Sequence, residues 1–214
     1  MAGYDETEMT ADAPQLKNDT RWALALVAAT LAYNSAEAVL SIAAGLIAGS
    51  IALVGFGFDS MIEVSAGVIV LLHLVRRSEE DSPWEQRTAQ FVGVTFILLA
   101  VFVAYEAARD LIAAEAPDVS YLGIAIAIAS LAIMPAMSVA KHRLAHRIGS
   151  RALEAESRET LVCSYLSAAL LLGLSANALL GWWWADPIAA LVIVAVLARE
   201  GWEAFTRREL CCVD

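Results

Sequence analysis

The chain is poor in cysteine, histidine and basic residues, and each shortage excludes a class of protein. Three cysteines, at positions 163, 211 and 212, are too few for a disulfide framework. Lys and Arg number 14 against 24 Asp and Glu, which gives a formal charge of −10. No basic stripe can therefore neutralise phosphates, and we expect no nucleic-acid partner. The N-terminus also lacks the basic region and apolar run of a signal peptide. No H-E-x-x-H metalloprotease motif is present, and we expect no enzyme activity.

Apolar sequence is what the chain has in abundance. Hydrophobic residues make up 59% of its 214 positions, whereas soluble domains are about 45–50% apolar. Six apolar segments are each long enough to cross a bilayer core of about 30 Å as a helix. We therefore predict an all-α membrane protein with a six-helix transmembrane domain at residues 21–208. The predicted helices span about residues 21–46, 50–75, 84–113, 119–147, 150–176 and 186–207.

Outside these helices we predict two short tails. Residues 1–20 are acidic and are expected to be disordered, and residues 209–214 follow the last helix. The last helix is expected to start with Asp186 as its N-cap and Pro187 at its first helical position.

The distribution of Lys and Arg predicts the orientation in the membrane. The loops and tails on one side hold nearly all of them, including Lys141, whereas the opposite side holds only Arg109. By the positive-inside rule, both termini are cytoplasmic and the protein is a multi-pass protein of the plasma or inner membrane.

Two acidic residues stand inside the second apolar segment. Asp59 and Glu63 are four residues apart, so a helix places them on one face. An ionised carboxylate at the bilayer centre costs roughly 2.5–3.5 kcal/mol, and two would cost about 5–7 kcal/mol. A bound cation or proton must offset that cost, unless a basic neighbour such as Arg158 neutralises the pair.

The stretch that leads to this pair occurs twice. Gly49-Ser50-x-Ala52-Leu53 is repeated one hundred residues later as Gly149-Ser150-x-Ala152-Leu153. The two copies begin at opposite membrane faces in the predicted topology. Ten residues of helix, about 15 Å, bring both copies to the midplane. The pattern predicts an inverted repeat around a central site.

The repeat predicts which residues share that site. Asp59 corresponds to Glu159, and Glu63 corresponds to Cys163. Three carboxylates and a thiolate can ligate a divalent cation, so we predict these four as metal ligands. The thiolate favours Zn²⁺ or Cd²⁺, and the carboxylates also admit Co²⁺, Fe²⁺ or Mn²⁺. Because ligands lose protons when metal binds, metal and protons can exchange. Cys163 as a packed apolar residue and Glu159 paired with Arg158 remain alternatives.

Further polar residues lie near this site in sequence. Asn34 and Glu37 stand mid-way in the first helix, where Glu37 is a candidate auxiliary ligand, proton carrier or partner of Arg158. Glu156 and Arg158 make the inner end of the fifth helix polar. His142 and His146, one turn apart, are only a weak metal signal without a third ligand.

Several of these motifs together resemble the cation diffusion facilitator family. The matching stretches are Asn34, Gly45–Leu53, Asp59-x3-Glu63, Ser150–Glu156 and Trp184–Ala190. The resemblance implies a six-helix, usually dimeric domain that exports divalent metal from the cytosol against protons. It also implies a site of two residues from each of helices two and five.

The sequence departs from the family in two respects. Glu63, Glu159 and Cys163 replace the usual His and Asp ligands, so metal selectivity is left open. The family's cytosolic C-terminal domain is missing from the chain, so a homodimer is expected to form through transmembrane helices.

We therefore expect a transporter that exchanges metal for protons by alternating access, with no cofactor besides the transported ion. The alternative is a membrane protein that binds or senses metal without transporting it.

Overall fold

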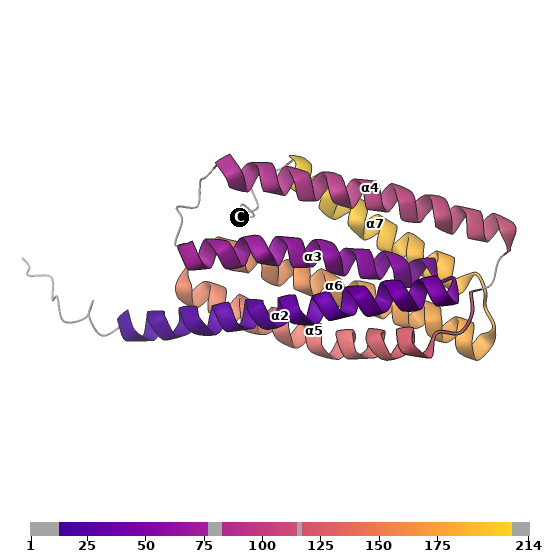
Figure 1. Cartoon of the computed structure of the whole chain (residues 1–214), viewed down its shortest axis with the longest axis horizontal. Coiled ribbons are helices and arrows are strands. Elements are labelled where there is room, and N and C mark those ends of the chain that lie inside the picture. Colours follow the sequence, from indigo (N-terminus) through magenta and orange to yellow (C-terminus); the bar gives the residue numbers. More distant parts are fainter. Residues whose placement is uncertain (1–12, 77–82, 115–116, 207–214) are drawn as a thin grey trace, which may run out of the picture.

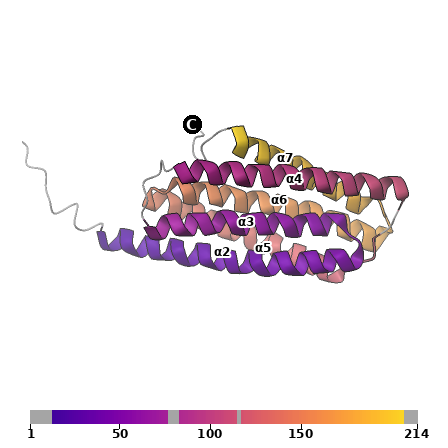
Figure 2. The ribbon, with the colours of Figure 1, turned by 45° about the horizontal axis from the view of Figure 1, so that its top comes forward.

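The computed structural model describes residues 13–76, 83–114 and 117–206, and these form a bundle of long helices (Figure 1). The helices lie along a common direction in both views (Figure 2), and successive helices run in opposite directions. The first and last described helices therefore have their outer ends at the same end of the bundle. The predicted all-α, six-helix architecture is confirmed. The helices are α2 (Ala13–Ala48), α3 (Ile51–Arg76), α4 (Pro83–Ala113), α5 (Tyr121–Ile148), α6 (Arg151–Leu180) and α7 (Ala185–Thr206).

The structure differs from two of the approximate predicted boundaries. Residues 13–20, predicted as part of a disordered tail, form the first turns of α2. Pro14 is tolerated there because the first turn of a helix needs no N–H donor from it. The Thr20 hydroxyl donates to the Leu16 carbonyl at 2.8 Å, and Asp19 lies 3.9 Å from Arg147 of α5. At the other boundary, α6 runs to Leu180 rather than residue 176.

Four of the helices, within the described residues, are long and apolar enough to cross a membrane by length and composition. These spans are Gln15–Ala48, Ile51–Leu72, Tyr121–Ile148 and Ala152–Leu180. The other two, α4 and α7, pack against each other. Charged residues at both ends of α4 and in the last two turns of α7 shorten their apolar stretches.

The outer surface is strongly apolar. Ile47, Ile112 and Leu179 are each more than four-fifths exposed, and many other Leu, Val and aromatic side chains also face outward. Large contiguous apolar surfaces are rare on soluble monomers and are expected where a protein faces lipid. The bundle is therefore a multi-pass membrane domain.

The two copies of the repeated stretch have the same local structure. Gly49 and Gly149 both have φ of 67°, a left-handed conformation that ends the preceding helix. Ser50 and Ser150 then cap the following helices, and their hydroxyls accept from Leu53 N at 3.1 Å and Leu153 N at 3.3 Å. The two junctions lie at opposite ends of the bundle (Figure 1). The predicted inverted repeat is thus visible in the fold.

Asp186 does not cap its own helix, contrary to the prediction. Its carboxylate accepts from the Ser50 hydroxyl at 2.5 Å and from Ala52 N at 3.3 Å, both at the start of α3. The side chain is almost fully buried. A carboxylate is favoured at a helix N-terminus because the exposed N–H groups carry partial positive charge. Asp186 therefore joins α7 to α3.

Replacing Asp186 by Ala is expected to destabilise the bundle. The change leaves buried donors at the start of α3 without an acceptor, which costs about 1–3 kcal/mol. The apparent melting temperature in detergent, followed by circular dichroism, measures the loss. Asp118→Ala is the matched control, because Asp118 is exposed near the N-terminus of α5. Equal losses in the two variants would contradict the cross-helix cap.

Candidate functional site

Polar side chains gather inside the bundle where α2, α3, α5 and α6 pack together. A membrane interior offers no water to these groups, so each must find a partner within the protein. Hydroxyls supply several of these contacts, such as the Ser167 hydroxyl on Ser130 at 2.9 Å and the Ser138 hydroxyl on the Ser157 carbonyl at 2.7 Å. The buried acidic, basic and amide side chains of this region are Asn34, Glu37, Asp59, Glu63, Lys141 and Glu156.

The predicted ligands lie on two of these helices. Asp59 and Glu63 are buried on α3, Cys163 is buried on α6, and Glu159 is half-buried on α6. The Glu63 carboxylate faces the side chains of Thr160 and Cys163, and Asp59 is within electrostatic range of Glu63 and Glu159. The four therefore share the α3–α6 interface. The ligand atoms of these four residues do not all lie within 4.8 Å of one another. Among the described residues, the ligand atoms of His142, His146 and Glu154 do. The metal-site assignment stays a prediction.

Glu63 is the most unusual group at this interface. Neither of its carboxylate oxygens has a hydrogen-bond partner of good geometry among the described residues, although both are buried. One oxygen each of Asn34, Glu37 and Glu156 is in the same condition. Buried acceptors without donors are rare in folded proteins and call for a cation, a proton or a water molecule. Oxygen acceptors from α2, α3 and α6 thus leave this interior short of positive charge.

Glu37 is tied to its neighbours rather than to Arg158. The Ser60 hydroxyl of α3 donates to Glu37 Oε2 at 3.0 Å, and Tyr33 and Ser130 also contact the carboxyl group. Glu37 is therefore inside the polar region as predicted. Of the three alternatives left open for Glu37, the pairing with Arg158 is wrong, because Arg158 pairs with Glu154.

The buried basic side chain among the described residues is Lys141, which was predicted to lie on the cytoplasmic side of the membrane. Its side chain is fully buried, and Nζ lies 2.9 Å from both Glu156 Oε1 and Thr160 Oγ1. Arg158, named above only as an alternative partner of the buried acids, is 58% exposed and pairs with Glu154 at 3.4 Å. The burial of Lys141 could have been predicted from the polar residues that share its face of α5. Ser130, Ser138 and Lys141 are spaced at helical intervals and form a polar stripe.

Glu200 of α7 is a second residue near the interface that the sequence pattern does not predict. It is half-buried and lies within electrostatic range of both Asp59 and Glu159. Glu200 follows Arg199 near the end of an apolar helix, as charged residues at a membrane interface commonly do. Nothing in the sequence therefore indicates that it lies near the buried acids. α7 therefore adds a carboxylate to the acidic side of the interface.

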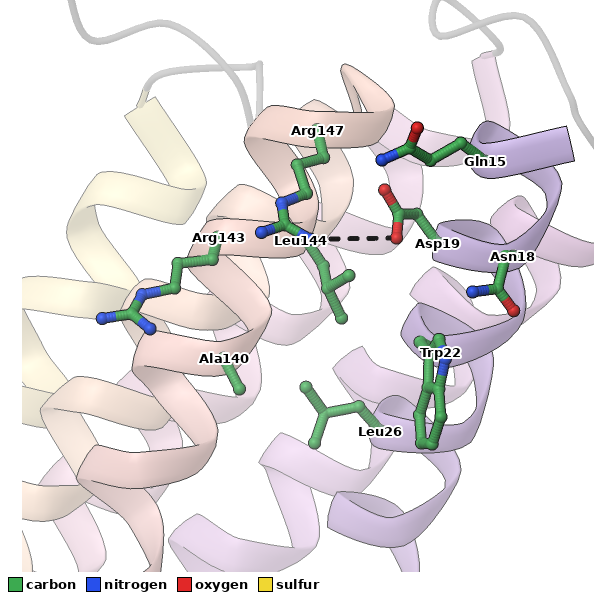
Figure 3. Close-up of a pocket in the computed structure, with 9 residues that line it drawn as sticks. All are labelled: Gln15, Asn18, Asp19, Trp22, Leu26, Ala140, Arg143, Leu144 and Arg147. Atoms are coloured by element: carbon green, nitrogen blue, oxygen red, sulfur yellow. Dashed lines mark ion pairs between the residues drawn. The ribbon is translucent and has the colours of Figure 1, made fainter. Parts of the chain in front are cut away.

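A hollow of about 570 Å³ lies elsewhere, between α2 and α5 (Figure 3). Arg147 projects from α5 toward Asp19 of α2, whereas the side chain of Arg143 points away from α2. None of the predicted ligands lines it, so it is separate from the α3–α6 interface. Its lining residues are Gln15, Asn18, Asp19, Trp22, Leu26, Ala140, Arg143, Leu144 and Arg147.

An apolar helical bundle with an acidic, partly unsatisfied interior defines a class of multi-pass membrane proteins that handle ions. Residues 26–207 match the model of the cation efflux transmembrane domain, and the chain belongs to this family.

Two curated relatives are similar to most of the chain. An uncharacterized transporter sll1263 of Synechocystis sp. is 25% identical over 173 residues, which cover 76% of this chain and 56% of that protein. The uncharacterized transporter YdbO of Bacillus subtilis is 24% identical over 176 residues, which cover 78% of this chain and 60% of that protein. The chain thus spans under two thirds of the length of either relative.

Proposed function

We propose that this protein transports a divalent metal cation, Zn²⁺ or a similar transition metal, out of the cytosol in exchange for protons. Asp59, Glu63, Glu159 and Cys163 are the proposed ligands. The observation that carries the proposal is Glu63, whose buried carboxylate meets no hydrogen-bond donor in good geometry among the described residues and faces Cys163 across the α3–α6 interface. Family membership supports the transport of a cation.

The acidic interface supports metal and protons as alternating occupants. Carboxylates that lie close together cannot all remain ionised in a low-dielectric interior without a counter-charge. A bound divalent cation supplies that charge, and protons supply it when the cation leaves. Carboxylate oxygens and a thiolate suit Zn²⁺ at about 2.0–2.3 Å, so the four side chains would have to close around the ion to bind it.

The inverted repeat supports alternating access to this site. The Gly49 and Gly149 junctions lie at opposite ends of the bundle and lead into the two helices that carry the proposed ligands. Related movements at the two ends would open the interface to either side in turn. Glu37 and the Lys141–Glu156 pair are the proposed proton-coupling groups beside the metal ligands. The side-chain oxygen of Asn34 is the proposed auxiliary ligand.

We place both chain ends in the cytoplasm, following the distribution of Lys and Arg. We also propose a homodimer formed through the apolar outer faces of the membrane helices.

The test of transport is metal-driven proton movement in reconstituted vesicles. A pH-sensitive dye in the lumen should report alkalinisation when Zn²⁺, Cd²⁺, Co²⁺ or Mn²⁺ enters, because protons leave as metal arrives. Mg²⁺ is the matched control ion, since it prefers oxygen ligands and retains its water. Tight metal binding with no pH change would refute the exchange and favour a metal-binding or sensor protein.

Cys163→Ser is expected to change which metal is preferred. A hydroxyl is a harder ligand than a thiolate, so transport of Zn²⁺ and Cd²⁺ should fall by roughly tenfold more than that of Mn²⁺. The measurement is the apparent KM for each ion in the vesicle assay. Cys211→Ser, in a position outside the described residues, is the control for loss of a thiol. An unchanged ion preference would remove Cys163 from the ligand set.

A further inference from the structure

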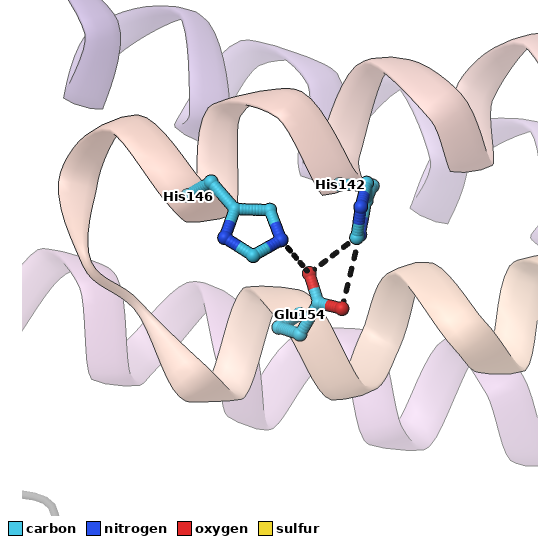
Figure 4. Close-up of side chains that lie close together, drawn as sticks. All are labelled: His142, His146 and Glu154. Carbon is cyan, nitrogen blue, oxygen red and sulfur yellow. Dashed lines mark hydrogen bonds and ion pairs between the residues drawn. The ribbon is translucent and has the colours of Figure 1, made fainter. Parts of the chain in front are cut away.

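Two histidines and a glutamate meet where α5 ends and α6 begins (Figure 4). His142 and His146 lie one turn apart on α5, and Glu154 lies in the first turn of α6. The ligand atoms of all three residues lie within 4.8 Å of one another. Glu154 Oε2 is 2.7 Å from His142 Nδ1 and 3.8 Å from His146 Nε2. The third ligand that the histidine pair lacked in the sequence is therefore supplied by the fold.

The backbone around the turn holds these residues in place. Gly149 reverses the chain in a left-handed conformation, and the Ser150 hydroxyl caps α6. This turn sets the first turn of α6 beside the last turns of α5, so Glu154 faces both rings. The rings contact edge to face with centroids 4.5 Å apart. Both histidines are at least half exposed, so they are open to solvent and can rotate to shorten the longer contact.

The donor set is that of a transition-metal site. Two imidazole nitrogens and one carboxylate oxygen are common ligands of Zn²⁺ and Co²⁺, and water completes the coordination. Arg158 approaches the other oxygen of Glu154, Oε1, at 3.4 Å. Oε2, which both rings approach, is therefore left for a metal. Binding would compete only with the His–Glu contacts, which contribute little to stability because both imidazole rings are at least half exposed.

We propose that His142, His146 and Glu154 bind one divalent transition-metal ion per chain, at a peripheral site separate from the ligands at the α3–α6 interface. The bound ion links α5 to α6 across the Gly149–Ser150 junction. It therefore restrains one of the two repeat junctions without occupying the membrane interior.

The test is metal binding by the full chain in detergent, purified without a histidine tag. The background is Asp59→Asn/Cys163→Ser, which weakens the interior ligands. Equilibrium dialysis should find one bound Zn²⁺ per chain, and His142→Gln/His146→Gln should lose it. Co²⁺ should give the visible absorption of a low-symmetry site in the background protein and not in the double histidine variant.

Two further variants separate ligation from structural effects. Glu154→Gln should weaken Zn²⁺ binding by at least about tenfold, whereas Glu203→Gln should not. Glu203 is the matched control because it is also paired with an arginine four residues away, Arg199, at 3.1 Å. His142→Cys should keep the site and shift its preference toward Cd²⁺ by at least about tenfold.

Unchanged Zn²⁺ binding in the double histidine variant would overturn the proposal, and so would equal effects of the two glutamate substitutions. The outcome is independent of the proposed transport. Peripheral binding that persists in a protein without metal-driven proton flux would refute transport alone.

Discussion

Replacing Asp59 by Asn, or Glu159 by Gln, is expected to abolish metal-driven proton flux. Each amide has nearly the shape of the acid it replaces but can neither lose a proton nor carry negative charge, so it is a poor metal ligand and no proton carrier. We expect the rate to fall by about two orders of magnitude or more. The measurement is the luminal pH change on addition of Zn²⁺ to vesicles that contain equal amounts of inserted protein.

Glu106→Gln is the control for this prediction. Glu106 lies near the end of α4 and pairs with Arg109 at 2.9 Å, so it is a carboxylate of the bundle without a proposed place in the site. Its substitution should leave the flux within about twofold of the parent protein, since surface ion pairs contribute little. Normal flux in both the Asp59 and the Glu159 variants would contradict their assignment as metal ligands.

Replacing Lys141 by Met is expected to destabilise the protein by about 3–5 kcal/mol, because it leaves the Glu156 carboxylate buried without its counter-charge. Lys141 and Glu156 are both almost inaccessible to solvent, and their contact is 2.9 Å long. The double variant Lys141→Met/Glu156→Gln should recover much of the loss, since it removes both charges together. Unfolding in mixed micelles with increasing denaturing detergent measures the free energy of each variant.

Arg158→Met is the control for Lys141→Met, because it removes an exposed basic side chain from the next helix, α6. Arg158 is exposed and its pair with Glu154 is solvated, so the change should cost no more than about 0.5 kcal/mol. Similar losses for Lys141→Met and Arg158→Met, or no recovery in the double variant, would show that the Lys141–Glu156 pair is not the buried pair that the structure indicates.

The helices and their order were predictable from the sequence because they depend on local properties. Segment length, apolar composition and the Gly-Ser repeat require no knowledge of neighbouring helices. The two Gly-Ser junctions, at Gly49–Ser50 and Gly149–Ser150, have the same structure because a left-handed glycine and a serine cap are themselves local devices. The start of α2 was missed because polar residues in an acidic tail do not resemble a membrane helix, although α5 packs beside them.

The site was predictable only in part. The positions of Asp59 and Glu63 on one helical face follow from their spacing. The repeat predicts partners for them on α6, where Glu159 lies within electrostatic range of both. Their separation from the outer surface was also expected from the energetic cost of charge in lipid. The contribution of α7 through Glu200 was not, because nothing in its spacing connects it with Asp59 or Glu159.

The sequence by itself determined that this chain forms six apolar helices with an internal repeat and acids in its interior. Only the tertiary structure decided which charged side chains meet. Lys141 rather than Arg158 enters the interior, Asp186 caps α3 rather than α7, and Glu154 joins the two histidines. A helix fixes the relative angles of its own residues, whereas the face that it turns to each neighbour depends on the packing of all the helices together.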